Sequence, residues 1–226
     1  MQRVRRLASV VAVATAGILA LSACRSDPTV AAYVGDHEIT EAQVSEIVED
    51  LRQKVGEEAG VSLPTRAQVV TDLVLVTACE QISSETGYRS QPYAVAYVVQ
   101  QTGLPADSTY VQRKADLLTC LAGLPAADPT EEELAELVDQ LRELGEVSAD
   151  TSNEEVVERV GRELLRTAYG QRRSLADAMV TYDVSVNPRY RPLEYPLLTF
   201  DDGNSRAVLV SVSIGEDSSG TVLDQR

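Results

Sequence analysis

The 226-residue chain carries 35 acidic and 20 basic residues, a formal charge of −15, which disfavours nucleic acids and anionic lipid headgroups as binding partners because like charges repel. Its single histidine, His37, stands beside a predicted turn and offers neither a metal site nor a catalytic triad. A chain of this length can bury one sizeable hydrophobic core, so we expect one main domain.

The amino terminus has the layout of a secretory signal peptide. Three arginines precede an uncharged run from Leu7 to Ala20, which is shorter than the roughly 20 apolar residues of a membrane-spanning helix. The run ends in Leu21-Ser-Ala-Cys24, which resembles the bacterial lipobox. That resemblance implies removal of residues 1–23 and a diacylglycerol or palmitate-type lipid on Cys24. The alternative is an ordinary signal peptide that is cleaved near a buried cysteine.

Cleavage before Cys24 would place the chain on the extracytoplasmic face of the cell membrane, held there by its lipid. The remaining residues 24–226 would have a charge of −18 instead of −15, because Arg3, Arg5 and Arg6 are lost. Residues 24–29 would form a tether, of which the five residues from Arg25 reach at most roughly 18 Å at about 3.5 Å each. The folded body would therefore lie close to the bilayer.

Two further cysteines, Cys79 and Cys120, would lie in a compartment where disulfides persist. We expect them to pair, and closing a loop of this size stabilises a chain by roughly 3–4 kcal/mol in the chain-entropy model. The alternative is two separate buried thiols that act as small hydrophobic groups. Because neither cysteine belongs to a C-x-x-C motif, redox catalysis is not indicated.

Capping boxes and apolar spacing predict a mainly α chain. Four boxes mark helix starts: Thr40 with Gln43, Thr65 with Gln68, Thr130 with Glu133, and Ser152 with Glu155. In chain order, the predicted elements are a hairpin at Val30–Ile39, helices at Thr40–Gly56, Thr65–Ile82, Gln91–Gln101 and Ser108–Leu121, a loop at Gly123–Pro129, and two helices that start at Thr130 and Ser152.

The last two helices have clear apolar stripes. The stripe after Thr130 runs to Leu144, and the helix from Ser152, predicted as the longest, continues to about Ala178 or Tyr182. Its expected inward side chains are Val157, Val160, Leu164, Ala168, Leu175 and Met179. Prolines then favour an extended path, with a strand at Ala207–Ile214 and a polar tail.

Two segments carry a family resemblance. The run Ala31-Ala-Tyr-Val-Gly35, with Ile39 and Thr40 after it, resembles the start of the N-terminal domain of SurA-type and PrsA-type extracytoplasmic chaperones. The segment Val184–Tyr190 resembles the end of that domain in actinobacterial lipoproteins, where a strand returns to the hairpin. Those relatives usually have glycine after the tyrosine, where this chain has Arg191.

The resemblance implies a multi-helix SurA N-terminal-like domain at residues 30–190, with a small β-hairpin joined by a C-terminal strand. Residues 191–226 would be an extended arm with a possible strand and a frayed tail. Many members of the family insert a parvulin-type prolyl isomerase domain, but Leu144 and Ser152 are too close in sequence to enclose one. The implied activity is binding of unfolded or nascent exported polypeptides without proline isomerisation.

The sequence contains no recognisable catalytic motif, so we expect no enzyme activity, no cofactor and no metal. The Asp201-Asp-Gly-Asn204 segment is interpreted as a turn, since the twelfth position of a calcium loop is Val212. Tyr93, Tyr97 and Tyr110 are the candidates for a client-binding aromatic patch. The alternative function is that of a non-catalytic accessory subunit, which docks one specific cell-envelope protein.

Overall fold

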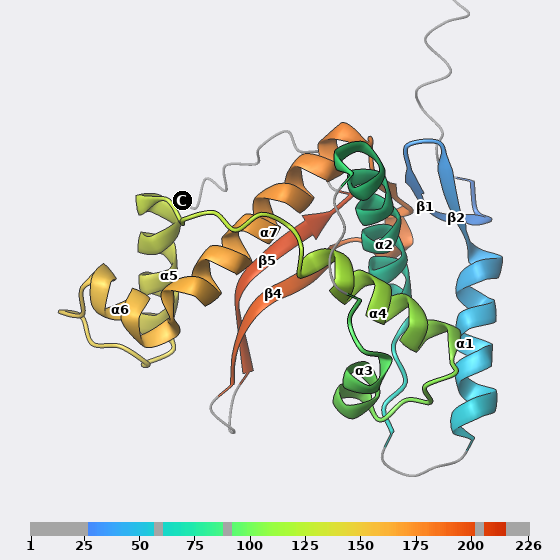
Figure 1. The fold of residues 1–226 in the computed structure, drawn as a ribbon, viewed down its shortest axis with the longest axis horizontal. Helices are drawn as coiled ribbons and strands as arrows, with labels where there is room; N and C mark the ends of the chain where they lie inside the picture. Colours follow the sequence, from blue (N-terminus) through green and yellow to red (C-terminus); the bar gives the residue numbers. More distant parts are fainter. Residues whose placement is uncertain (1–26, 57–60, 88–91, 202–205, 216–226) are drawn as a thin grey trace, which may run out of the picture.

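The computed structural model describes residues 27–56, 61–87, 92–201 and 206–215, and this part of the chain is mainly helical with two small antiparallel sheets (Figure 1). The predicted mainly α class is confirmed. The helices are α1 (Glu41–Val55), α2 (Arg66–Thr86), α3 (Val95–Thr102), α4 (Thr109–Leu121), α5 (Glu131–Glu143), α6 (Asn153–Val160) and α7 (Arg162–Thr181). The strands are β1 (Val30–Val34), β2 (His37–Thr40), β3 (Ser185–Val186), β4 (Leu193–Asp201) and β5 (Arg206–Ile214).

The predicted hairpin and the strand that returns to it form one sheet, in the order β2-β1-β3. Ala32 of β1 pairs antiparallel with Ile39 of β2 and with Val186 of β3. Asn187 secures this junction, because its side-chain amide donates to the Val30 carbonyl oxygen at 3.0 Å, across 157 residues of sequence. The prediction of a small β-hairpin joined by a C-terminal strand is therefore confirmed.

The four capping boxes form as predicted and start α1, α2, α5 and α6. At Thr40, the hydroxyl accepts from the Gln43 N–H at 3.2 Å, while the Gln43 side chain accepts from the Thr40 N–H at 2.7 Å. Such bonds satisfy backbone donors that the first helical turn leaves without partners. Helix α3 is shorter than predicted and begins at Val95; the predicted start, Gln91, lies outside the described residues.

Helices α1–α4 and sheet β2-β1-β3 pack together with the carboxyl-terminal half of α7, and we call this part the inner lobe. Helix α2 lies at its centre, as its nearly continuous apolar sequence predicted. Its innermost side chains have no exposed area: Val70, Val74, Leu75 and Ala78.

Helices α5 and α6 and the amino-terminal half of α7 form a second cluster, which we call the outer lobe. It lies at one end of the molecule, away from α1 (Figure 1). Gly170 lets α7 pack tightly against the segment that leads into α5, because a Cβ there would overlap the Pro125 carbonyl oxygen and lie 2.8 Å from the Ala126 Cα. A larger residue would push the two segments apart.

The prediction of one unbroken helix from Ser152 is wrong. Helix α6 ends at Val160 because Gly161 adopts φ 101° and ψ 115°, which lie outside the helical region. After this break α7 presents a different face, so that Leu165 is fully buried whereas Leu164, expected to point inward, is 50% exposed. Leu144 is also exposed, since α5 ends at the residue before it.

Beyond β3 the chain forms a long antiparallel hairpin, β4–β5, which runs beneath α7 (Figure 1). The predicted strand at Ala207–Ile214 is confirmed as part of β5, and its partner β4 tolerates Pro196 beside a register irregularity. The hairpin contributes Ile214 to the inner core and Leu209 to the outer core. Most of the predicted polar tail, from residue 216, lies outside the described residues.

Candidate functional site

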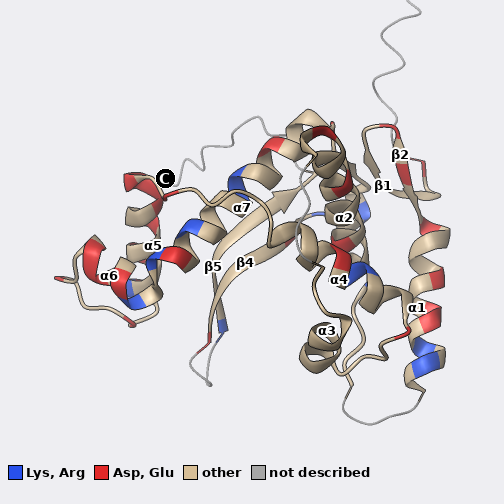
Figure 2. Ribbon diagram, viewed as in Figure 1, with Lys and Arg blue, Asp and Glu red and all other residues tan. Residues whose placement is uncertain are grey.

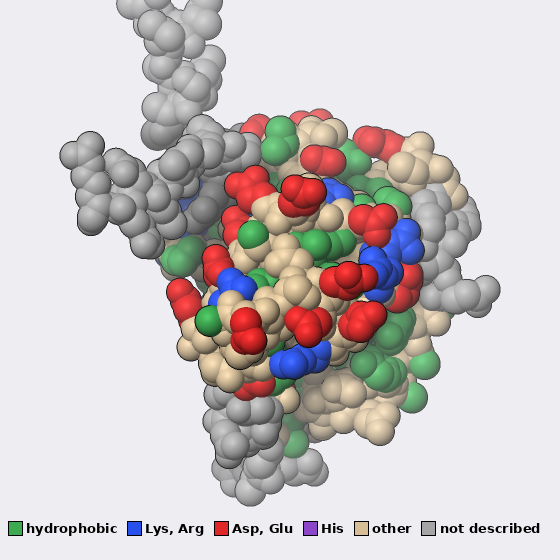
Figure 3. All heavy atoms as spheres, turned by 90° about the vertical axis from the view of Figure 1, so that its left-hand side faces the viewer, with side chains coloured by type: hydrophobic (Ala, Val, Ile, Leu, Met, Phe, Trp, Pro, Cys, Tyr) green, Lys and Arg blue, Asp and Glu red, His purple; other side chains and the backbone are tan. Residues whose placement is uncertain are grey.

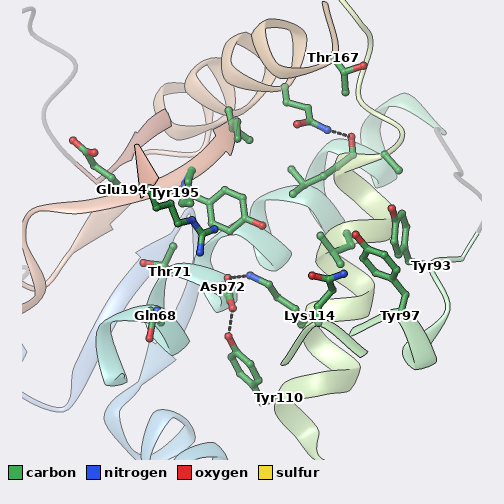
Figure 4. Close-up of a pocket in the computed structure, with 18 residues that line it drawn as sticks. Gln68, Thr71, Asp72, Tyr93, Tyr97, Tyr110, Lys114, Thr167, Glu194 and Tyr195 are labelled. Carbon is green, nitrogen blue, oxygen red and sulfur yellow. Dashed lines mark hydrogen bonds and ion pairs between the residues drawn. The ribbon is translucent and has the colours of Figure 1, made fainter. Parts of the chain in front are cut away.

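A groove of about 810 Å³ lies between the inner lobe and the β4–β5 hairpin. Helices α2 and α4 line its floor, α3 forms one rim, and β4 forms the opposite wall (Figure 4). The groove exists because α3 packs on α4 and β4 packs on α2. Its lining combines four tyrosines with aliphatic side chains, and further amides and hydroxyls come from Gln68, Thr71, Gln101, Thr167 and Gln171.

A buried polar network forms the floor of the groove. Asp72 of α2 accepts a bond from the Lys114 ammonium at 2.8 Å on one carboxylate oxygen, and from the Tyr110 hydroxyl at 2.8 Å on the other (Figure 4). Asp72 is buried and the Lys114 side chain is 20% exposed. Because each oxygen of the carboxylate has a partner, the cost of burying it is offset.

The Lys114 ammonium also lies 4.8 Å from the centroid of the Tyr195 ring, a cation–π distance. Burial by itself would lower the pKa of Lys114, but the negative charge of Asp72 beside the ammonium outweighs burial and raises it. Burial, and then the charge of Asp72, raises the pKa of Tyr110. Burial likewise raises the pKa of Tyr195, against the opposing charge of Lys114. Lysine and tyrosines therefore stay protonated at neutral pH, so the floor contains no activated nucleophile among these groups.

Two of the predicted client-binding tyrosines form the exposed rim. Tyr93 and Tyr97 are 37% and 42% exposed, and their rings meet edge to face with centroids 5.1 Å apart. The Tyr93 backbone N–H donates to the Thr119 hydroxyl of α4 at 2.7 Å, which fixes the start of this segment. Tyr110, the third candidate, also lines the groove but is buried, and its hydroxyl is bound to Asp72.

The expected cysteine partners join the two floor helices. The sulfur atoms of Cys79 in α2 and Cys120 in α4 lie 2.12 Å apart, with Cα atoms 5.9 Å apart, a distance compatible with the predicted disulfide. Both helices supply floor residues, so this link would hold the two sides of the floor together. Formation of the disulfide is a prediction, and thiol titration of the denatured, unreduced protein checks it.

The other sequence predictions lie elsewhere. Cys24 and the proposed signal peptide are outside the described residues. His37 is exposed in β2, as expected. In the described ranges, no group of three or more His, Cys, Asp or Glu side chains is placed to hold a metal ion, and no helix has the length and apolarity to span a membrane.

Sequence reasoning missed Asp72, Lys114 and Tyr195 as parts of the site. Asp72 gave a usable signal, since a carboxylate in a helix that is apolar on almost all sides requires a buried partner. Its partner could not be identified, because Lys114 lies 42 residues further along the chain. Tyr195 falls in a segment expected only to be extended, and it reaches the groove because β4 packs on α2.

Comparisons with known proteins found no matching family model, no matching curated protein and no matching solved structure.

Proposed function

We propose that this chain is a membrane-anchored, extracytoplasmic chaperone-like lipoprotein that binds unfolded or nascent exported polypeptides in the groove, without prolyl isomerase activity. The groove itself carries the proposal. It has about 810 Å³ of space, exposed Tyr93 and Tyr97 on one rim, and Tyr195 on the opposite wall. This volume falls within the range of ligand-binding clefts, roughly 300–1,000 Å³.

The lining suits a polypeptide of variable sequence. Tyrosine rings supply large contact areas at a low cost in side-chain entropy, and the hydroxyls of the exposed Tyr93 and Tyr97 can form hydrogen bonds with a ligand. Side chains such as Gln101 and Thr167 can donate to or accept from the main chain of any segment. Because Lys114 pairs with Asp72, the floor demands no particular ligand charge.

The position of β1 supports the anchored part of the proposal. This strand belongs to the inner lobe and begins at Val30, six positions after Cys24. A lipid on Cys24 would therefore hold the groove-bearing lobe near the bilayer. The return of β3 to β1 is in keeping with a SurA N-terminal-like domain, and we retain that relationship as part of the proposal.

An aggregation assay tests the function. A chemically unfolded exported protein is diluted into buffer with increasing amounts of this protein in mild detergent, with a parallel proline-isomerisation assay. We expect suppressed aggregation and no isomerase activity. Absence of suppression at excess would overturn the polypeptide-binding proposal.

Variants on the rim locate the activity. Replacing Tyr93 and Tyr97 by alanine should weaken client binding about fivefold per ring, on the basis of about 1 kcal/mol for each aromatic contact. The matched control is Val180→Ala, because Val180 is also an exposed hydrophobic residue but does not line the groove. Equal loss in the rim variants and the control would place binding elsewhere.

The acidic outer lobe favours the alternative function, an accessory subunit that docks one cell-envelope protein. Residues 128–166 contain 13 carboxylates and 4 arginines, a net charge of −9. Figure 2 shows acidic positions along α5 and α6, and Figure 3 shows acidic side chains spread over the end of the molecule that lies at the left in Figure 1. Such a surface would steer a basic face of a partner. Purification of a single stoichiometric partner, with no suppression of aggregation, would favour this function.

A further inference from the structure

The two ends of the groove wall carry opposite charges without partners. Glu194 near the start of β4 and Arg206 at the start of β5 are both exposed, and both line the groove. Within the described ranges neither side chain has an ion pair or a hydrogen bond. These charges are therefore available to a ligand, unlike those of Asp72 and Lys114 in the floor.

The register of the hairpin sets the spacing of the two backbone positions from which these side chains reach into the groove. Glu194 pairs with Ser213 and Asp201 pairs with Arg206, so that the two rungs are seven residues apart along each strand. At about 3.3 Å per residue, the backbone positions are roughly 23 Å apart. An extended segment of about seven residues lying along β4 would span the same distance.

Between these charges the groove is aromatic and electrically balanced. Figure 4 shows Tyr195 on the β4 side and Tyr93 and Tyr97 on the opposite side, with the Asp72–Lys114 pair between them, while Glu194 lies beyond Tyr195. Apolar or aromatic side chains could pack between the rings. A charged group of the ligand would therefore meet an unpaired opposite charge only at Glu194 or at Arg206.

We propose that the groove selects extended polypeptide segments that carry a cationic side chain at one end and a carboxylate about seven residues away, with apolar residues between them. This inference rests on the proposed polypeptide-binding function and adds to it a ligand class defined by charge spacing. The cation would pair with Glu194 and the carboxylate with Arg206. Either chain direction satisfies both pairs, so the spacing and signs of the charges matter and their order does not.

Four fluorescent peptides with blocked ends and the same apolar core test the proposal on the full-length protein in detergent. One carries Lys and Asp six positions apart, so that both side chains face the same side of an extended segment, one carries two Lys, one carries two Asp, and one carries Lys and Asp side by side. We expect the spaced Lys/Asp peptide to bind roughly three- to fivefold more tightly than the others, since an exposed ion pair is worth up to about fivefold. The preference should shrink as salt is added.

Charge-reversal variants then test the assignment of each end. Arg206→Glu should transfer the preference to the two-Lys peptide, and Glu194→Lys should transfer it to the two-Asp peptide. Arg162→Glu is the control, because Arg162 is exposed in the outer lobe and does not line the groove. A transfer of preference cannot result from simple misfolding, which would weaken all four peptides together.

The outcomes separate this inference from the proposed function. Equal affinity for the four peptides would overturn the charge-spacing inference and leave polypeptide binding intact. No binding of any peptide would contradict the proposed function as well. A self-association of the protein that Arg206→Glu abolishes, without peptide binding, would assign the groove to a second copy of the chain and overturn the inference.

Discussion

The two lobes differ in how they are held together. Of the described buried apolar side chains, 32 belong to the inner core and 12 to the outer core. Hydrophobic stabilisation scales with the apolar area removed from water, so the smaller outer core contributes less stability. The outer lobe therefore depends more on α7 and the β4–β5 hairpin, which it shares with the inner lobe. The inner lobe also contains the Cys79–Cys120 pair, whereas residues 128–166 contain no cysteine.

The lobes also differ in what they present to partners. The groove is built mainly from the inner lobe and the hairpin, and the proposed tether leads into the same lobe. The outer lobe contributes a concentrated negative charge instead. The proposed binding and anchoring would therefore depend on the more extensively packed part of the molecule, and we expect the outer lobe to open locally without loss of the groove.

Truncation of one core leucine in each lobe should give the largest difference between the lobes. Leu75 in the inner core and Leu137 in the outer core are both almost fully buried, so Leu→Ala should remove about 3 kcal/mol of local stability at either site. Leu75→Ala should increase amide exchange throughout the chain, whereas Leu137→Ala should increase it in α5 and α6 alone. Hydrogen-exchange mass spectrometry measures both, and equal exposure of both lobes by Leu137→Ala would contradict independent opening.

Removal of the cysteine pair should weaken only the inner lobe. The Cys79→Ala/Cys120→Ala variant should lose roughly 3 kcal/mol of stability, because the link restrains a long loop of the unfolded chain. Chemical denaturation with and without reductant measures the effect, and the double variant should no longer respond to reductant. Two titratable thiols in the denatured, unreduced wild-type chain would show that the cysteines do not pair.

The buried ion pair offers a smaller perturbation, at the groove itself. Lys114→Met should cost about 2 kcal/mol, because it leaves Asp72 buried with one partner fewer, although partial exposure of the site limits the penalty. The double variant Asp72→Asn/Lys114→Met should recover part of that loss. Urea unfolding of the four proteins in the cycle gives the coupling energy, and additive losses would mean that the pair contributes no coupling.

Acidification should destabilise the outer lobe at α5, and we expect this effect to be smaller than those of the substitutions above. Burial alone would raise the pKa of Glu133, but hydrogen bonds from the Thr130 N–H and Arg173 outweigh burial and lower it. A carboxyl whose folded pKa is lowered stabilises the fold above its unfolded pKa, roughly 4.3, and loses that contribution as pH falls through the folded pKa.

Amide NMR signals of α5 between pH 6 and 3 should therefore report opening of that helix at the acidic end. Glu133→Gln should reduce this pH dependence and cost about 1 kcal/mol at neutral pH, because it removes the charge that pairs with Arg173 while glutamine can still accept the Thr130 N–H bond. Glu132→Gln, an exposed change in the same helical turn, is the control. Identical pH profiles for wild type and Glu133→Gln would contradict the assignment.

Helix starts and the hairpin were predictable because short-range contacts determine them. Thr40, Thr65, Thr130 and Ser152 each bond within three residues, and Gly35 and Asp36 form the turn between paired strands. The candidates Tyr93 and Tyr97 were partly predictable for a related reason, because the helical pattern around them is short and irregular. The burial of Tyr110 was not, because it depends on Asp72 in another helix.

The sequence alone determined the mainly α class, the capped helices and the apolar faces, all of which depend on residues within a few positions of one another. Tertiary structure decided the break at Gly161, the pairing of β4 with β5, and the groove with its Asp72–Lys114 floor. Several conformations are open to glycine, a strand can pair with more than one partner, and a buried carboxylate can meet any nearby cation. Only the packing of distant segments selects among these, because the free energy that favours one arrangement comes from contacts formed after the chain has folded.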